Sequence, residues 1–385
     1  MKKSTLVLFA LASGFAVGNL YFIQPLLGAI SEDLGTTATQ NGWLVTAVQL
    51  GYAVGIVLLL PLGDVIARKR LVPFMMTLAG LSQIAIGFST GYVPLMISLV
   101  AVGVTTISGQ VLVPLTGELS DDTNRGKNVA FVVSGMIIGI LGARILSGTF
   151  SDLFGWHLTF TLIGLANMAL ALALNRAIPV LPEKQHINYL PLVSGTFSLL
   201  ARNPRVLGTM AVNSFGLIIF SSVWTSITFL LSGEQFNFST TQIGAWGLFG
   251  IVGAIGARNS GRLIDAGKGD LASKVAWVLV AVGMAIGALA EQSLIFLAVQ
   301  LVIMDASMQA IGITNQTRLI SMFPEARSRV NAGYVTVNFL GAALGSALAT
   351  ALWASFGWVG LQLLGTGLAL VALLLWVLNR RSFNR

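Results

Sequence analysis

Two ionisable residues lie deep inside apolar stretches of this 385-residue chain, and they are the first candidates for chemistry. Arg144 interrupts an apolar run from about residue 128 to 151, and Asp305 interrupts another from about 293 to 317. All other Lys and Arg residues can be placed at the ends of apolar runs or in the loops between them. An ionised group in hydrocarbon costs a few kcal/mol or more, so it is retained where it faces a partner or a water-filled cavity. Each of the two is therefore a functional-site candidate.

The two residues differ in the chemistry that they offer. Burial favours the neutral form of a carboxyl group, so Asp305 is a candidate proton carrier. It lies 14 residues after Glu291, which places it about 21 Å into a helix and near the middle of a bilayer. The alternative is a carboxylate held in a structural hydrogen-bond network. Arg144 stays charged and does not easily relay protons, but it can attract an anionic substrate, pair with a carboxylate, or cap polar groups between helices as a structural residue.

Composition indicates an integral membrane protein. The chain is 55% hydrophobic and only 9% charged, whereas soluble domains carry about 25% charged residues. Its apolar runs of roughly 20 residues fit helices rather than barrel strands. The net charge of +8 is explained by basic loops, so no nucleic-acid partner is expected. We find no nucleophile–base pair, no metal-ligand cluster and no nucleotide-binding loop, so we expect no enzyme activity, no metal and no cofactor.

The apolar runs predict twelve transmembrane helices in an all-α integral membrane protein. If they cross in sequence, all Lys and Arg residues outside the spans fall on one side of the membrane. The loops on the other side contain no Lys or Arg, and their ionisable residues are Glu32, Asp33, Asp152, His157, Glu234 and Glu291. This asymmetry predicts a multi-pass membrane protein with both termini in the cytoplasm. The expected domains are a six-helix bundle at 1–177, a cytoplasmic linker at 178–205 and a second six-helix bundle at 206–385. The expected spans are about 5–30, 40–62, 71–90, 93–117, 128–151, 157–177, 206–231, 240–260, 271–290, 293–317, 328–354 and 358–378.

The two halves of the chain repeat each other at a nearly constant offset. Phe154-Gly155-Trp156 recurs as Phe356-Gly357-Trp358, an offset of 356 − 154 = 202. Further matched pairs are Asp64 with Asp265 (265 − 64 = 201), Gly139 with Gly341 and Arg125 with Arg327 (both 202). Duplicated six-helix halves with a substrate site between them are typical of transporters.

The sequence resembles the major facilitator superfamily over nearly its whole length, and within it the bacterial drug:proton antiporters and sugar-efflux-like permeases. The resemblance implies a twelve-helix fold that works by alternating access, in the inner membrane of a bacterial cell. Four places depart from the family pattern. Leu60 and Val65 stand where a Gly and an Arg are usual, Ala143 stands where a Pro is usual, and span 4 lacks the Arg that many proton-coupled relatives use. The segments that carry the resemblance are residues 19–27 (NLYFIQPLL), 61–70 (PLGDVIARKR), 110–114 (QVLVP), 139–148 (GILGARILSG), Asp305, 315–318 (NQTR) and 324–331 (PEARSRVN).

The resemblance also implies site residues. Four charged residues in the loop after the second span and in its repeat would form a cytoplasmic gate; the alternative is that they only set the topology. They are Asp64, Arg68, Lys69 and Asp265. In the family, spans 1, 4, 7 and 10 line the cavity, so their polar residues are substrate-binding candidates, with hydrogen bonding between helices as the alternative. Together with Arg144 these candidates are Asn19, Tyr21, Gln24, Gln110, Asn213, Gln309 and Asn315.

The expected function is export of small drug-like or amphipathic organic solutes by proton antiport, with Asp305 as the proton site. A sugar or organic-anion facilitator or symporter is the alternative, in which Arg144 holds a carboxylate; a lipid transporter of the same fold is another. The expected partners are a small-molecule substrate, protons and the lipid bilayer, and the expected oligomeric state is a monomer.

Overall fold

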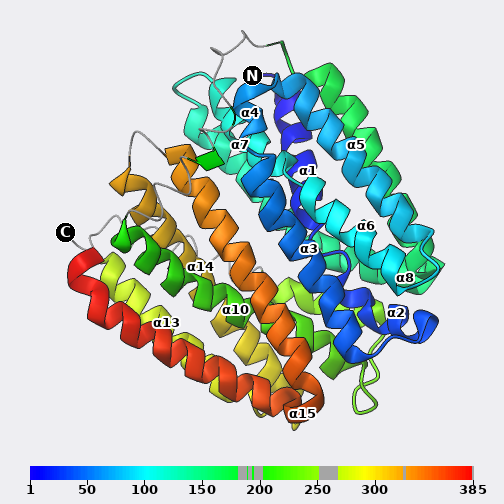
Figure 1. The fold of residues 1–385 in the computed structure, drawn as a ribbon, viewed down its shortest axis with the longest axis vertical. Helices are drawn as coiled ribbons and strands as arrows, with labels where there is room; N and C mark the ends of the chain where they lie inside the picture. Colours follow the sequence, from blue (N-terminus) through cyan, green and yellow to red (C-terminus); the bar gives the residue numbers. More distant parts are fainter. Residues whose placement is uncertain (181–188, 190–192, 195–202, 251–267, 324–326, 384–385) are drawn as a thin grey trace. The chain divides into compact units, whose positions relative to one another are not determined.

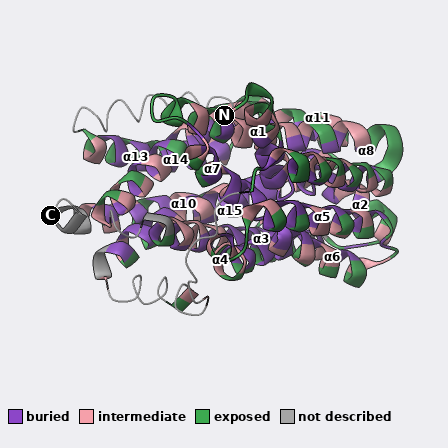
Figure 2. Ribbon diagram, turned by 90° about the horizontal axis from the view of Figure 1, so that it is seen from above, coloured by how far each residue is buried: buried purple, intermediate pink, exposed green. Residues whose placement is uncertain are grey.

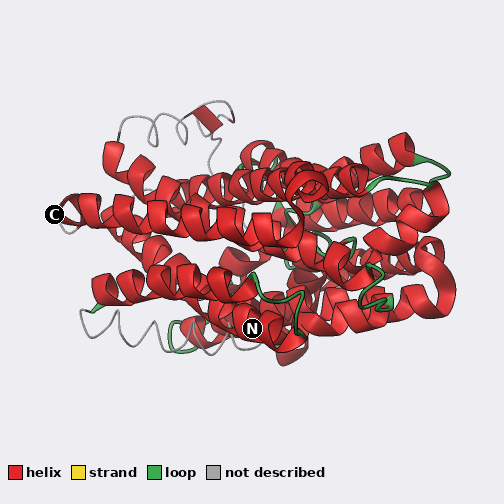
Figure 3. Ribbon diagram, turned by 90° about the horizontal axis from the view of Figure 1, so that it is seen from below, coloured by secondary structure: helices red, strands yellow, loops and turns green. Residues whose placement is uncertain are grey.

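The computed structural model describes residues 1–180, 189, 193–194, 203–250, 268–323 and 327–383. All regular elements in these ranges are helices (Figure 3). Within the described residues, eight helices are long and apolar enough to cross a membrane. Most of the expected linker 178–205 lies outside the described residues, and so does the gate candidate Asp265.

The chain divides into two compact units that follow the two halves of the sequence, except for two short segments. Unit 1 contains Met1–Thr36, Ala47–Val193 and Asn237–Gly247. Unit 2 contains Thr37–Thr46, Ser194–Phe236 and Leu248–Arg385. Each unit therefore includes one short segment from the other half of the sequence.

The first half of the sequence forms short and long helices, several of them interrupted (Figure 1). The first expected span is one such case, because the helix α1 ends at Gly18 and a 3-10 turn with Pro25 follows after a short turn. Proline lacks a backbone N–H and so favours such a break. The elements are α1 (Lys3–Gly18), η1 (Gln24–Leu26), α2 (Leu27–Leu34), α3 (Ala38–Leu58), α4 (Leu62–Val65), α5 (Arg68–Gly87), α6 (Tyr92–Thr105), α7 (Ser108–Glu118) and α8 (Arg125–Ala177).

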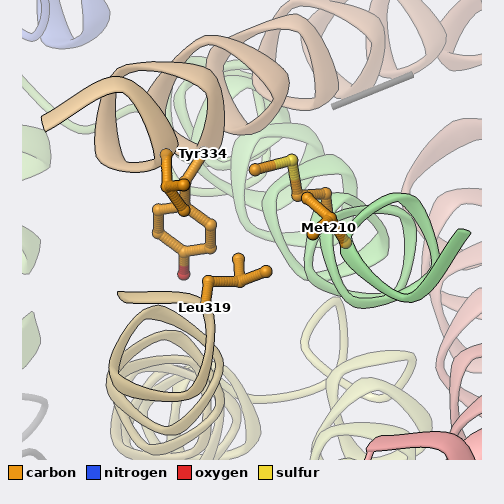
Figure 4. Close-up of a cluster of buried hydrophobic side chains, with 5 residues drawn as sticks. Met210, Leu319 and Tyr334 are labelled. Carbon is orange, nitrogen blue, oxygen red and sulfur yellow. The ribbon is translucent and has the colours of Figure 1, made fainter. Parts of the chain in front are cut away.

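In the part of the second half that the structure describes, four helices are long and two helical segments are short. A cluster of buried side chains joins three of them where Met210, Leu319 and Tyr334 meet (Figure 4). Val206 and Val330 complete this cluster. The elements are α10 (Pro204–Ser232), α11 (Thr240–Ala245), η2 (Trp246–Phe249), α13 (Gly269–Gly287), α14 (Leu294–Met322) and α15 (Arg327–Phe383).

Glycines break the two longest helices, α8 and α15, at equivalent places in the repeat. Gly155 has φ 78° and ψ 157°, and Gly357 has φ 56° and ψ −158°. Only glycine adopts such angles without strain, so each break lies at the Gly of a Phe-Gly-Trp triplet. Each Trp after the break is buried, and the indole N–H of Trp358 donates to the carbonyl oxygen of Gly287 at 2.7 Å. Each long helix thus contains two of the expected spans.

The repeat is also visible in how the helices pack. A Cβ atom added to Gly139 would lie 2.2 Å from the carbonyl oxygen of Gly14, which brings α8 against α1. A Cβ added to Gly341 would lie 3.0 Å from the carbonyl oxygen of Ser214, which brings α15 against α10. Close helix approach through small residues is common in membrane proteins. The repeat seen in the sequence is therefore present in the contacts.

Most helices carry both buried and exposed residues (Figure 2), and the exposed ones include many large apolar residues. Ile138 is 69% exposed, Leu172 is 64% exposed and Ile295 is 71% exposed. Such apolar exposure over whole helices fits a surface in contact with lipid, whereas the polar candidates among the described residues are mostly buried.

Candidate functional site

Arg144 lies inside unit 1 and contacts two other substrate-binding candidates, Tyr21 and Gln24. Its Nε donates a hydrogen bond to Oε1 of Gln24 at 2.8 Å. Its guanidinium carbon lies 4.9 Å from the centre of the Tyr21 ring, a cation–π arrangement. The Arg144 residue is only 3% exposed. The kinked segment after α1 and the middle of α8 therefore bring Tyr21, Gln24 and Arg144 into one buried polar cluster.

A second polar cluster in unit 1 contains Asn19. The Asn19 amide donates to Oγ1 of Thr106 at 3.2 Å, and its Oδ1 accepts from the amides of Gln83 at 2.9 Å and Asn167 at 3.2 Å. Asn167 also donates to Oε1 of Gln83 at 2.8 Å. All of these residues are buried. The geometry favours the alternative of hydrogen bonding between helices for Asn19. Gln83, Thr106 and Asn167 were not among the sequence candidates: Gln83 and Asn167 lie in spans 3 and 6, outside the spans that were expected to line the cavity, and Thr106 has hydroxyl neighbours that give it no distinct signal.

Gln110 lies elsewhere in unit 1. Its amide donates to the hydroxyl oxygen of Tyr52 at 3.2 Å, which joins α7 to α3. Gln110 is half-buried and Tyr52 is buried. Tyr52 is a partner that the sequence did not predict, since an aromatic residue in an apolar span has no special signal.

Asp305 lies in the middle of α14 in unit 2. It is 12 residues after the cap residue Ser293 and 13 residues before Arg318, so it is about 18–20 Å from each of these residues. It is 5% exposed. Gln309 and Gly312 lie four and seven residues further on, so the three share one helix face. Gln309 is exposed and a Cβ added to Gly312 would meet only the hydroxyl of Tyr334, at 3.7 Å. The buried carboxyl group thus lies on the same helix face as an exposed amide and a glycine.

The amide candidates of unit 2 form their own cluster. Asn213 donates to Oδ1 of Asn338 at 2.6 Å, and Asn315 donates to Oδ1 of Asn213 at 3.2 Å. The Tyr334 hydroxyl donates to the carbonyl oxygen of Gly312 at 3.0 Å. Asn213 and Asn315, two of the substrate-binding candidates, are therefore hydrogen-bonded to each other, and Asn338 of α15 completes the cluster.

The gate candidates of the first half are tied together at the start of α5. Arg68 forms an ion pair with Glu118, lies 3.7 Å from the carboxylate of Asp64, and donates from Nε to the carbonyl oxygen of Gly63 at 3.2 Å. Lys69 follows on the same helix and is half-buried. Glu118 was missed because its partner is 50 positions away in the sequence.

In unit 2 a second ion pair stands at the equivalent place. Arg318 Nη2 lies 2.6 Å from Oδ1 of Asp270, which joins α14 to α13. The offset of the internal repeat is the signal that could have found it, since 270 − 68 = 202 and 318 − 118 = 200.

Comparison with known proteins places this geometry in a family. The family model described as Major Facilitator Superfamily matches residues 9–290. The chain is 36% identical over 386 residues to a protein of Escherichia coli O157:H7 named "Uncharacterized transporter YgaY", covering 100% of this chain and 97% of that one. It is 32% identical to "Probable transporter SCO4007" of Streptomyces coelicolor, covering 92% of this chain and 83% of that one.

Among solved structures, the fold is similar to a bacterial homologue of the human lysosomal transporter Spinster in an inward-facing and occupied conformation. The TM-score is 0.78 at 14% identity, covering 98% of this chain and 96% of that one, so this likeness concerns the fold alone. The expected all-helical transporter fold is confirmed. The chain is a multi-pass membrane transporter rather than an enzyme, and it belongs to the major facilitator superfamily.

Proposed function

We propose that the protein exports small drug-like or amphipathic organic solutes by alternating access, driven by protons that enter through Asp305. The observation that carries this proposal is the burial of one carboxyl group, 5% exposed, in the middle of the apolar helix α14. A carboxyl group in such a place is costly when charged, so coupled binding and release of a proton is a reason to retain it. The exposed Gln309 and the small Gly312 on the same helix face leave that face open to a solute.

The test is transport by purified protein reconstituted in liposomes. The internal pH is recorded with an entrapped dye while cationic, neutral and anionic solutes are added in turn. One class should move protons with the native protein, and Asp305→Asn should abolish that movement while solute binding remains. Glu291→Gln is the matched control, because Glu291 is an exposed acid at the loop that precedes α14. Proton movement that is the same in Asp305→Asn and in the native protein would exclude Asp305 as the carrier.

The topology that we propose puts both termini in the cytoplasm. The ion pairs of Arg68 and Arg318 would then lie at the cytoplasmic side, and Asp33, Asp152 and Glu291 at the outer side. In this arrangement Asp64, Arg68 and Lys69 belong to a cytoplasmic gate, whose ion pair with Glu118 must rearrange or move as a body when the transporter changes state.

A second candidate function is transport of an organic anion, and the Arg144 cluster favours it. A buried guanidinium that already contacts Gln24 and Tyr21 provides charge, a hydrogen-bonding amide and an aromatic face within one site. Planar carboxylates bind guanidinium groups through two parallel hydrogen bonds. In the liposome assay, Arg144→Lys would then reduce flux of anionic solutes alone. An equal loss for cationic and neutral solutes would show that Arg144 is structural.

A further inference from the structure

Two short segments each belong to the compact unit formed mainly by the other half of the sequence, and they occupy equivalent places in the repeat. Residues 37–46 belong to unit 2 and residues 237–247 belong to unit 1, and the offsets are 237 − 37 = 200 and 247 − 46 = 201. We call them the first arm and the second arm. Each begins with the same reciprocal cap: Thr37 with Gln40 in the first, and Ser239 with Gln242 in the second. The exchange is therefore a feature of the repeat rather than of one loop.

A carboxylate holds the second arm. Oδ1 of Asp152 accepts from the Thr240 hydroxyl at 2.5 Å and from the Thr240 backbone N–H at 3.2 Å, while Oδ2 accepts from the Thr241 N–H at 2.8 Å. The Thr240 hydroxyl also lies 2.7 Å from the carbonyl oxygen of Gly148. Hydrogen bonds to a charged acceptor are the stronger kind in proteins. These contacts fix the first turn of α11 on α8.

The same arm covers Arg144. Arg144, Gly148 and Asp152 are spaced by four residues, so they form one stripe along α8. A Cβ added to Gly244 would lie 2.4 Å from the carbonyl oxygen of Arg144, and one added to Gly247 would lie 3.3 Å from its Cδ. The backbone of the arm therefore lies directly against the candidate anion-binding residue.

The first arm is packed in the equivalent way but without a charge. Gly42 matches Gly244, since 244 − 42 = 202, and the Ser346 hydroxyl donates to the carbonyl oxygen of Gly42 at 3.2 Å. A Cβ added to Gly42 would lie 1.4 Å from Oγ1 of Thr350. Ser346 takes the place of Arg144, and Ala354 takes the place of Asp152 (354 − 152 = 202). The residue at this position is therefore a carboxylate beside the second arm and a methyl group beside the first.

We propose that Asp152 is a positioning residue: its carboxylate holds residues 237–247 over Arg144, and release of this arm uncovers Arg144 during the transport cycle. Because the position equivalent to Asp152 carries only the methyl group of Ala354, a carboxylate holds the second arm and none stands at that position beside the first. The proposal deepens the alternating access described above by naming a contact that must break. It does not depend on proton coupling through Asp305 or on the class of solute.

Hydrogen–deuterium exchange followed by mass spectrometry tests this directly on the full-length protein in lipid nanodiscs. In Asp152→Ala the peptide that covers 237–247 should exchange about tenfold faster or more, since hydrogen bonds to a charged group are lost. The peptide that covers 37–46 should be unchanged, and it serves as the internal control. Unchanged exchange in the second arm, or an equal rise in both arms, would overturn the proposal.

A glycine pair provides a second and independent variant. Gly244→Ala leaves Asp152 intact but would place a methyl group against the Arg144 carbonyl, so it should also speed exchange in the second arm. Gly142→Ala is the matched control, because a Cβ at Gly142 would meet nothing within 4 Å. Equal exchange of the second arm in these two glycine variants would contradict the close contact on which the proposal depends.

Thiol labelling measures whether release of the arm uncovers the Arg144 region. Ser147 is buried and directly precedes Gly148, where an added Cβ would lie 2.3 Å from the carbonyl oxygen of Thr240 in the second arm, and the chain contains no native cysteine. Ser147→Cys should therefore react faster with a maleimide when it is combined with Asp152→Ala than when it stands alone. Ser147→Cys combined with Gly142→Ala is the control and should react at the rate of Ser147→Cys alone. Equal rates in all three proteins would contradict the proposal.

Discussion

Arg68 and Asp270 occupy equivalent places in the two halves of the repeat and carry opposite charges. Arg68 begins α5 and pairs with Glu118 at the end of α7. Asp270 lies in the first turn of α13 and pairs with Arg318 in α14 at 2.6 Å. Both halves therefore have an ion pair at this position, but the base stands at the first site and the acid at the second in one half, and the order is reversed in the other half. What the repeat preserves is an ion pair at this position rather than a particular residue.

The exchanged charges predict that the first pair can be reversed. Arg68→Asp should lower stability, because it removes the pair and places like charges near Asp64 and Glu118. Arg68→Asp combined with Glu118→Arg reproduces the order found in the second half and should recover most of the loss. Because the Arg68 side chain is only 9% exposed while that of Glu118 is 41% exposed, the loss should be about 1–3 kcal/mol, between the values of a surface pair and a buried one. The measurement is thermal unfolding in detergent, with Lys69→Asp as a control. A double variant no more stable than the single one would contradict the prediction.

Close packing between α1 and α8 predicts different outcomes for two glycines three residues apart. Gly139→Ala would place a Cβ 2.2 Å from the carbonyl oxygen of Gly14, so the helices must separate at a cost of about 1–3 kcal/mol. Gly142→Ala should be neutral or stabilising by up to about 1 kcal/mol, since its Cβ meets nothing within 4 Å and alanine favours the helix. Unfolding temperatures of the two variants measure the difference. Equal temperatures would show that the contact is less close than the structure has it.

The sequence predicted the fold well because the bilayer imposes simple rules on it. Apolar length and the distribution of basic residues indicated a helical membrane protein, and the Phe-Gly-Trp triplets located two breaks, at Gly155 and Gly357, where the structure has positive φ angles. The breaks within the first span and between α6 and α7 were not predicted. Local backbone turns inside an apolar run change neither its hydropathy nor its length, so such patterns do not report them.

The site was predicted only in part, because hydrogen-bond partners depend on tertiary contacts. Polar residues inside spans were singled out as a group, and the structure brings Arg144 together with Tyr21 and Gln24. Nothing in the sequence indicated that Glu118 pairs with Arg68, or that Asp152 holds residues of the second half. The repeat offset carried some of this information, since it relates Arg68 to Asp270 and Gly42 to Gly244.

The buried network around Asn19 predicts a structural rather than a substrate-binding role for that residue. Asn19→Ala and Asn167→Ala each remove several hydrogen bonds from one network, and each should lower stability by roughly 1–2 kcal/mol, at about 0.6 kcal/mol per bond between helices. Transport by the protein that remains folded should show an unchanged apparent affinity for solute. The exposed Asn124→Ala is a control for both measurements. If Asn19→Ala instead changed the apparent affinity and left the unfolding temperature unaltered, Asn19 would line the substrate path and the network would be secondary.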